Sequence, residues 1–153
     1  MHKLNLLVVF WSLCQFANSM STDDQEIGAV KWATKFEIQI GNKFYHFETN
    51  KANWFQAANH CRELGGYLLN FESSEEMDAI LPILPQGQIQ FWTSAHCLSG
   101  NRKFISVTSG EPMPYMRWFP NEPNNLNNNE FCVELRINGG ALNNIHCTNK
   151  WTG

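Results

Sequence analysis

Apolar and polar residues alternate near the start of the patterned part of this chain. Residues 36–40 (Phe-Glu-Ile-Gln-Ile) alternate strictly, Gly41-Asn42 interrupts the pattern, and residues 44–47 resume an extended pattern. Alternation predicts a half-buried strand, and a short break with glycine between two such segments predicts a hairpin. We therefore expect a β-hairpin over this region.

Two helices are predicted after the hairpin. Asn53 is a favourable N-cap, and Gln56 completes a capping box. The apolar face of this first helix carries Trp54, Ala57, Ala58, Cys61 and Leu64. Ser73 begins the second helix in the same way, with Glu76 at the box position, and Pro82 ends or kinks it.

The second half of the chain has little periodicity. Residues 91–93 and 131–135 are strand-like, whereas residues 94–130 hold many glycines, prolines and asparagines without a regular pattern. Long irregular loops inside compact domains are usually functional. The order strand, helix, helix, long loop and strands predicts an α+β fold, with two helices packed on small antiparallel sheets.

The first residues predict export from the cell. A basic start precedes the apolar run 4–13, and small or polar residues at 17–19 offer a cleavage site. A buried N-terminal helix is the alternative. We divide the chain into a signal peptide (1–19), a flexible segment (20–33) and one folded domain (34–153). We expect a secreted, extracellular protein without membrane insertion.

Length and charge narrow the function further. The chain has 153 residues, of which 43% are apolar, and a net charge of −3. This is enough for one domain with a hydrophobic core. No basic cluster is present, so a nucleic-acid partner is not expected.

Export also changes the interpretation of the five cysteines. Cys14 leaves with the signal peptide, and an oxidising compartment favours pairing among Cys61, Cys97, Cys132 and Cys147. Four cysteines allow three connectivities, and spacing alone does not choose between them. A zinc site is the alternative, but no CxxC pair or Cys-His ligand spacing favours it.

The segment 118–135, WFPNEPNNLNNNEFCVEL, is rich in side-chain oxygens. The candidate oxygen donors are Glu122, Asn124 and Glu130, together with Asn143 and Asn144. Carboxylate and amide oxygens are the ligands that calcium prefers. A cis bond before Pro123 would turn the side chains on either side of it in the same direction. The alternative is that the asparagines serve only to form turns.

These motifs resemble those of C-type lectins, which are calcium-dependent carbohydrate-recognition domains. The resemblance rests on Glu122-Pro123-Asn124, on Glu130, on Cys132, and on residues 142–147, Leu-Asn-Asn-Ile-His-Cys, in place of the family's WND motif and following cysteine. Residues 91–93 match a core strand of the family. The resemblance runs from about residue 36 to residue 150.

The resemblance implies a double-looped α+β domain in which one calcium ion bridges protein and sugar. Glu122, Asn124, Glu130 and Asn143 match the positions that bind both calcium and sugar, and Asn144 matches a further metal position. In the family, Glu-Pro-Asn accompanies mannose-like sugars, although galactose stays open. We expect glycans or glycoproteins as partners and leave oligomers open.

Three departures from the family pattern modify these expectations. The family's aspartate is Asn144 here, so the site has two negative charges instead of three and should bind calcium more weakly. The family's tryptophan is Leu142. The chain ends at Gly153, so we expect the family's final strand, whose cysteine pairs with the cysteine at position 61, to be missing.

The cysteines are assigned only in part. We predict a Cys132–Cys147 disulfide, which would bring the 122–130 loop near the 143–144 turn. Cys61 and Cys97 stay uncertain: a bond between them, free thiols and intermolecular bonds are all open.

Two other functions are weighed against sugar binding. His96 beside Cys97 suggests a thiol nucleophile with a base, but neighbours on a strand face opposite ways and no third orienting group is evident, so we expect no enzymatic activity. Asn144 favours the second alternative, a lectin-like domain that binds a protein ligand without calcium.

Overall fold

A computed structural model describes residues 38–85 and 90–152. The predicted signal peptide and flexible N-terminal segment lie outside these residues. The elements are β1 (Ile38–Ile40), β2 (Lys43–Tyr45), β3 (Lys51–Ala52), α2 (Trp54–Glu63), α3 (Ser74–Ile80), η1 (Leu81–Ile83), β4 (Gln90–His96), β5 (Ile105–Ser106), η2 (Leu126–Asn128), β6 (Cys132–Arg136), β7 (Ala141–Ile145) and β8 (Trp151–Thr152). The α+β prediction is confirmed.

The predicted hairpin and both helix starts are confirmed. β1 and β2 pair antiparallel across Gly41-Asn42. The Asn53 side chain accepts from the backbone N–H of Gln56 over 2.9 Å, and the Gln56 side chain accepts from the N–H of Asn53 over 3.0 Å. The Ser73 hydroxyl caps α3 through the N–H of Glu76. Local sequence signals therefore set where both helices begin.

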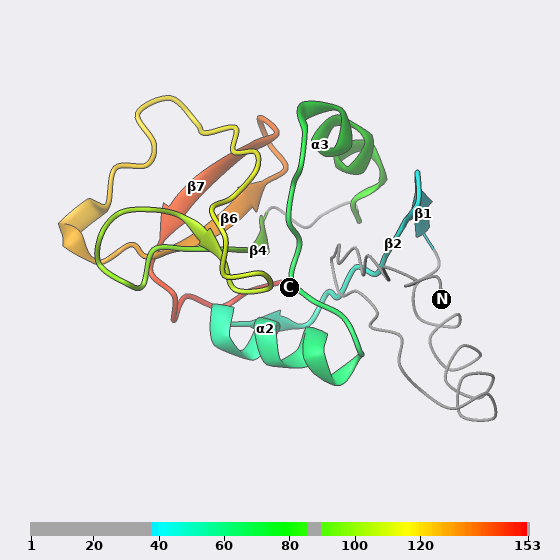
Figure 1. The fold of residues 1–153 in the computed structure, drawn as a ribbon, viewed down its shortest axis with the longest axis horizontal. Helices are drawn as coiled ribbons and strands as arrows, with labels where there is room; N and C mark the ends of the chain where they lie inside the picture. The colour runs from blue at the N-terminus through cyan, green and yellow to red at the C-terminus, as the bar shows by residue number, and fades with distance from the viewer. Residues whose placement is uncertain (1–37, 86–89, 153) are drawn as a thin grey trace, which may run out of the picture.

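The larger sheet has the order β3-β8-β4-β6-β7, and β5 also pairs with β4. β4, β6 and β7 are antiparallel neighbours, whereas β4 and β8 are parallel. Figure 1 shows α2 below this sheet, and the long segment between β5 and β6 looping out on the other side. The sheet therefore separates the α2 side from the side that carries the irregular loops.

Strand β8 corrects one expectation from the sequence. The final strand was expected to be missing, but Trp151–Thr152 form a short strand that pairs antiparallel with β3 and parallel with β4 at Phe91. A turn after Cys147 separates β7 from β8. Two residues are enough to join β3 to the sheet through backbone hydrogen bonds.

Two clusters of buried residues fill the two sides of the sheet. One contains Trp54, Ala57, Cys61, Leu64, Leu68, Trp92, Cys132 and Cys147. The other contains Tyr45, Leu69, Phe71, Met77, Ile80, Leu84, Phe91, Ala95, Val133, Leu135 and Leu142. Alternation along β6 explains the division, because Cys132 faces one cluster while Val133 faces the other. Leu142, where the resemblance implies a tryptophan, is buried in the second cluster.

A buried lysine connects β2 to α3. The ammonium group of Lys43, on β2, lies 2.9 Å from the carboxylate of Glu72 and 2.8 Å from that of Glu76. The Tyr45 hydroxyl donates to the same Glu76 carboxylate over 2.7 Å. Because a buried charge needs partners, this group of side chains fixes the hairpin against the second helix.

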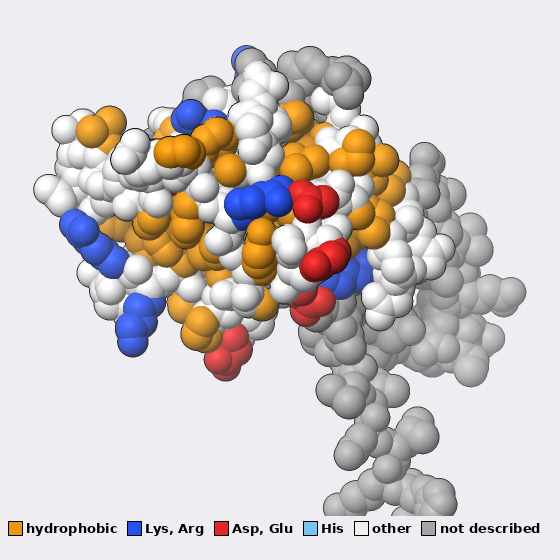
Figure 2. All heavy atoms as spheres, turned by 90° about the horizontal axis from the view of Figure 1, so that it is seen from above, with side chains coloured by type: hydrophobic (Ala, Val, Ile, Leu, Met, Phe, Trp, Pro, Cys, Tyr) orange, Lys and Arg blue, Asp and Glu red, His pale blue; other side chains and the backbone are white. Residues whose placement is uncertain are grey.

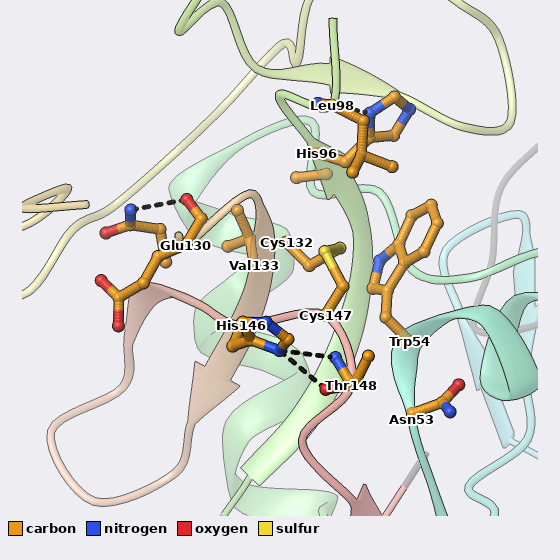
Figure 3. Close-up of a disulfide and its surroundings, with 12 residues drawn as sticks. Asn53, Trp54, His96, Leu98, Glu130, Cys132, Val133, His146, Cys147 and Thr148 are labelled. Atoms are coloured by element: carbon orange, nitrogen blue, oxygen red, sulfur yellow. Dashed lines mark hydrogen bonds between the residues drawn. A yellow bond between two sulfur atoms is a disulfide. The ribbon is translucent and has the colours of Figure 1, made fainter. Parts of the chain in front are cut away.

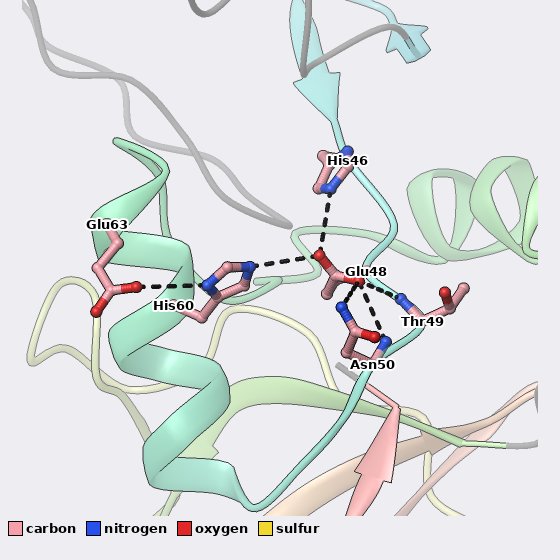
Figure 4. Close-up of polar contacts among 6 residues, drawn as sticks. All are labelled: His46, Glu48, Thr49, Asn50, His60 and Glu63. Carbon is pink, nitrogen blue, oxygen red and sulfur yellow. Dashed lines mark hydrogen bonds and ion pairs between the residues drawn. The ribbon is translucent and has the colours of Figure 1, made fainter.

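Glu48 makes a second polar connection, between the chain after β2 and helix α2. Its carboxylate accepts from the N–H groups of Thr49 and Asn50 and lies 3.3 Å from Nε2 of His60, on α2. Figure 4 shows His46 approaching the same carboxylate from another direction, at 4.0 Å. Partial burial raises the pKa of Glu48, but the Asn50 and Thr49 N–H groups and His60 outweigh burial and hold that pKa below its usual value.

Figure 2 shows one face, on which apolar side chains form a broad area while acidic and basic side chains lie in small separate groups. The exposed large apolar residues are Phe44, Phe55, Ile83, Leu98 and Leu126. Within the described ranges, no helix combines the length and apolarity needed to cross a bilayer.

Candidate functional site

The candidate site begins at the Glu122–Pro123 bond, which is cis as predicted. The Asn124 side-chain amide donates to Glu122 Oε1 over 2.6 Å, and the Asn124 backbone N–H donates to Glu122 Oε2 over 3.1 Å. Asn124 is exposed and Glu122 is half-buried. The structure therefore places these two predicted ligands side by side at the surface.

Glu130 lies against the same loop. Its Oε2 accepts from the backbone N–H of Leu126 over 2.8 Å, and the same N–H is 2.8 Å from Oδ1 of Asn124. Two predicted ligands thus share one backbone donor. At the other end, the side-chain oxygen of Asn125 accepts from the Glu130 N–H over 2.9 Å, which closes the loop.

Asn144 joins the two ends of this loop from strand β7. Its Oδ1 accepts from the Asn124 N–H over 3.0 Å, and its Nδ2 donates to the backbone carbonyl of Glu130 over 3.0 Å. The side chain is almost completely buried. Asn144 therefore lies beneath Asn124 and Glu130 and fixes their separation.

Asn143 is the predicted site residue that the structure does not bring to this group. Strand alternation places its side chain on the opposite face of β7 from that of Asn144. Its Nδ2 donates to Oε1 of Glu134 over 2.9 Å, in a fully buried contact. The geometry gives Asn143 a structural partner, and its role as a ligand stays a prediction.

Glu134 was not singled out from the sequence. Its carboxylate is completely buried; Oε1 also accepts from Arg136 over 2.7 Å, whereas Oε2 has no hydrogen-bond partner among the described residues. The sequence gives no sign of this burial, because Glu134 lies between the apolar residues Val133 and Leu135. A polar residue at such a position usually faces solvent.

The predicted Cys132–Cys147 disulfide is present and connects β6 to the chain after β7. Figure 3 shows Glu130 on one side of the disulfide, with its carboxylate pointing away from the sulfur atoms, and Trp54 of α2 on the other side. Cys147 also accepts from the Trp54 backbone N–H through its carbonyl, over 3.0 Å. The disulfide therefore anchors the base of the site to the helix side of the sheet.

The other two cysteines correct an open assignment. Cys61 is disulfide-bonded, whereas Cys97 is a free, buried thiol. A Cys61–Cys97 bond and a free Cys61 are therefore both wrong. Burial raises the pKa of the Cys97 thiol, which disfavours a reactive thiolate.

The His96 ring packs edge-on against Trp54, and its Nδ1 accepts from the Leu98 N–H.

The asparagine-rich run also has an unusual backbone conformation. Asn121, Asn125, Asn127 and Asn128 have φ values of 68°, 50°, 55° and 56°. Asparagine adopts this left-handed conformation more readily than most residues. The composition of the run therefore reflects loop shape as well as oxygen donors, as the turn-forming alternative proposed.

The electrostatics of the site favour a cation. Burial raises the pKa of Glu130, and the neighbouring carboxylates of Glu122 and Glu134 raise it further, against the Leu126 N–H and Arg136. Repulsion between carboxylates is relieved when a cation binds between them.

The donor set fits calcium by its chemistry. Glu122 and Glu130 supply two carboxylates, and Asn124 and Asn144 supply amide oxygens, all hard oxygen ligands. Over residues 38–85 and 90–152, no group of three or more His, Cys, Asp or Glu side chains could hold a metal ion. Amides must therefore provide part of any coordination shell.

A pocket of about 330 Å³ opens beside these residues. Its lining includes Glu130 and Asn144 of the candidate site, together with Arg102 and Asn128. Cys97 also contributes to the lining. Arg102 was not singled out from the sequence, because a lone arginine in an irregular loop carries no pattern.

Known proteins match both the sequence and the fold. A family model of the lectin C-type domain matches residues 50–152. C-type lectin 37Db of Drosophila melanogaster is 35% identical over 115 residues, which cover 74% of this chain and 76% of that protein.

Two solved structures illustrate the likeness in fold. The C-type carbohydrate-recognition domain of cow CD23, crystallised in the presence of a GlcNAc2Man3 oligosaccharide, has a TM-score of 0.69 and 28% identity over 76% of this chain and 87% of that one. A calcium-independent type II antifreeze protein has a TM-score of 0.66 and 20% identity over 74% and 85%. The second likeness shows the fold alone.

The family match covers the cap of α2, the disulfide and the whole candidate site. The matched residues also include both helices and strands β3, β4, β6, β7 and β8. This chain belongs to the C-type lectin domain family.

Proposed function

We propose that this domain binds carbohydrate in a calcium-dependent manner. The observation that carries the proposal is that Asn144 is hydrogen-bonded to both Asn124 and Glu130, so that oxygen donors distant in the sequence meet at one surface. Membership of the C-type lectin family, whose domains generally bind carbohydrate, supports the same function.

Glu122, Asn124, Glu130 and Asn144 would hold the calcium ion, and Asn143 stays a further candidate. When bound, the ion would supply coordination sites for two neighbouring hydroxyl groups of a sugar ring. The carboxylates of Glu122 and Glu130 would accept hydrogen bonds from those hydroxyls, and the Asn124 amide would donate one. Each side chain can serve both partners because it has two polar atoms.

Sugars with the equatorial hydroxyl pair of mannose are the favoured ligands, and galactose is the second choice. This preference is supported by Glu122-Pro123-Asn124 and by the orientation of Asn124, whose amide nitrogen lies beside Glu122. With two carboxylates, calcium affinity should lie toward the weak end of extracellular sites, at roughly 0.1–1 mM.

We place the domain outside the cell. The predicted signal peptide supports this location, and the Cys132–Cys147 disulfide suits an oxidising compartment. C-type lectin domains are binding modules, so we propose no reaction. Oligomers would raise the avidity of a single weak site.

Binding of a protein ligand without calcium is the second candidate. One observation favours it: the polar side chains of the site already have protein partners, because Asn124 donates to Glu122 and the Glu130 carboxylate accepts from the Leu126 N–H. A loop whose polar groups are hydrogen-bonded without an ion can present a rigid surface to a protein ligand.

Calcium titration by calorimetry, followed by a glycan array with and without chelator, separates the two functions. We expect calcium binding in the millimolar range or tighter, and glycan signals that disappear in EDTA. Glu130→Gln should weaken calcium binding at least about tenfold, because it removes one of two carboxylates. Glu111→Gln, an exposed position outside the site, is the matched control and should change nothing.

Sugar binding that persists in EDTA, or no calcium uptake at millimolar concentration, would contradict the proposal. Capture of a protein ligand in EDTA would then support the second candidate.

A further inference from the structure

The pocket beside the candidate ion site has a mixed lining. Arg102, Asn128, Glu130 and Asn144 provide polar groups, and the rings of Phe104 and Phe131 provide apolar walls. Its volume of about 330 Å³ lies within the range of small-molecule sites. Because Glu130 and Asn144 belong to both regions, a sugar held at the ion site would lie next to this pocket.

Arg102 is the basic residue of this lining. In the part of the chain that the structure describes, it forms no salt bridge. Its guanidinium makes a long hydrogen bond of 3.4 Å to the Asn128 side chain, and the residue is exposed. The positive charge of Arg102 lowers the pKa of Cys97 against the larger effect of burial, so its field reaches into the pocket. The guanidinium therefore has unused donors that face this space.

The charge balance of the region depends on the ion. Without a cation, the carboxylates of Glu122 and Glu130 carry two negative charges beside the single positive charge of Arg102. A bound calcium ion would neutralise these two carboxylates. Arg102 would then be the uncompensated charge of the pocket, which favours an anion there only in the presence of calcium.

We propose that this domain prefers acidic glycans, in which a carboxylate or sulfate group on the sugar enters this pocket and pairs with Arg102. The proposal rests on the calcium-dependent sugar binding proposed above. The planar guanidinium matches either anion with two parallel hydrogen bonds. The hydroxyl pair would fix the sugar at the ion site, and the anion would add a second attachment point.

Calorimetry with six related ligands tests this preference. The ligands are the methyl glycosides of mannose and galactose, each as the neutral sugar, the 6-carboxylate and the 6-sulfate. In saturating calcium, we expect at least one acidic form to bind about tenfold more tightly than its neutral parent, since charge-assisted pairs are the stronger hydrogen bonds. The two acidic forms identify which anion is preferred.

Arg102→Gln should abolish the acidic preference and leave the affinity for the neutral sugar unchanged, which also shows that the variant is folded. Lys103→Gln is the matched control: it removes the same charge from the adjacent exposed residue, and Lys103 does not line the pocket. It should keep most of the preference.

Three results would overturn the inference: equal affinity for acidic and neutral sugars, an acidic preference that survives Arg102→Gln, or an equal loss in Lys103→Gln. The proposed function would stand in each of these cases. If the wild-type protein binds none of the sugars in calcium, the proposed function itself fails.

Discussion

Asn144 donates a hydrogen bond from its side-chain nitrogen to the backbone carbonyl of Glu130 over 3.0 Å. An aspartate, which the resemblance places here in most family members, could accept hydrogen bonds but could not donate this one at neutral pH. The amide thus closes the loop by a neutral contact where the family pattern has a charge. Compared with an aspartate, Asn144 removes one negative charge from the site, but its hydrogen bonds hold the loop in place before any ion binds.

Asn144→Asp should therefore have two opposite effects. Calcium affinity should rise about tenfold, because a third carboxylate joins the site. In EDTA, the free energy of unfolding should fall by about 1–2 kcal/mol, because the Glu130 carbonyl loses its donor. Calorimetric calcium titration and urea denaturation in EDTA measure the two effects.

Asn129→Asp is the control for that experiment, because it adds the same charge at an exposed position of the same loop. If Asn144→Asp and Asn129→Asp raise calcium affinity equally, the added negative charge alone explains the increase. Asn144 would then not be a calcium ligand.

Asn143→Ala tests the residue that the structure turns away from the site. We expect a loss of about 2 kcal/mol in the free energy of unfolding, because buried Glu134 loses a hydrogen bond. Calcium affinity should change less than about twofold, since ligand charge and count set affinity and this side chain faces the other side of the sheet. Denaturation and calcium titration of the same preparation give both numbers.

The double variant Asn143→Ala/Glu134→Leu provides the control for stability. It should recover most of the loss, because removing both polar partners leaves no buried carboxylate without a donor. A loss of calcium affinity above about tenfold in Asn143→Ala would instead support the role predicted from the sequence.

Glu48 should make stability depend on pH. Its pKa in the folded protein lies below the usual value, so its contribution is fully present above the pKa of the unfolded chain and is lost as pH falls through the folded pKa. Glu48→Gln should lower the free energy of unfolding by about 1 kcal/mol at pH 6, a difference that disappears as pH falls below about 4. Urea denaturation across this range measures it.

Glu111→Gln serves again as the exposed control. Its free energy of unfolding should stay close to that of the wild-type protein at every pH. A Glu48→Gln deficit that persists unchanged at pH 3 would show that the contact is not electrostatic.

Removal of the Cys132–Cys147 disulfide should destabilise the domain strongly. The bond closes a loop with a sequence separation of 15, for which chain entropy gives about 3 kcal/mol. Cys132→Ala/Cys147→Ala should lose about this much in urea denaturation and should bind calcium more weakly, since Glu130 lies two residues from Cys132. Cys97→Ala, which leaves the disulfide intact, should lose less; equal losses would contradict the argument.

Much of the fold was predictable because its signals are local. The capping box at Asn53, the Ser73 cap, the hairpin at Gly41-Asn42 and the turn at Pro123 depend on residues close together in the chain. The ligand candidates Glu122, Asn124 and Glu130 could also be named, because carboxylates and amides gathered in one loop suggest their chemistry.

What could not be predicted depends on contacts between distant segments. The pairing of Asn143 with buried Glu134 follows from the register between β6 and β7, which no local pattern reveals. The short strand β8 exists because β3 and β4 offer free edges to two residues. That Arg102 and Glu130 line the same pocket depends on contacts between segments far apart in the sequence.

The left-handed backbone of Asn121, Asn125, Asn127 and Asn128 has a consequence for how this loop can change. Glycine could replace any of the four without deforming the chain, whereas valine or isoleucine would be excluded at each. At Asn121 and Asn127, natural variation is constrained by conformation and not by the identity of the amide. Sequence drift among asparagine, aspartate and glycine would thus be neutral at these two positions, whereas Asn125 and Asn128 also use their side-chain oxygens to accept from the Glu130 N–H and from Arg102.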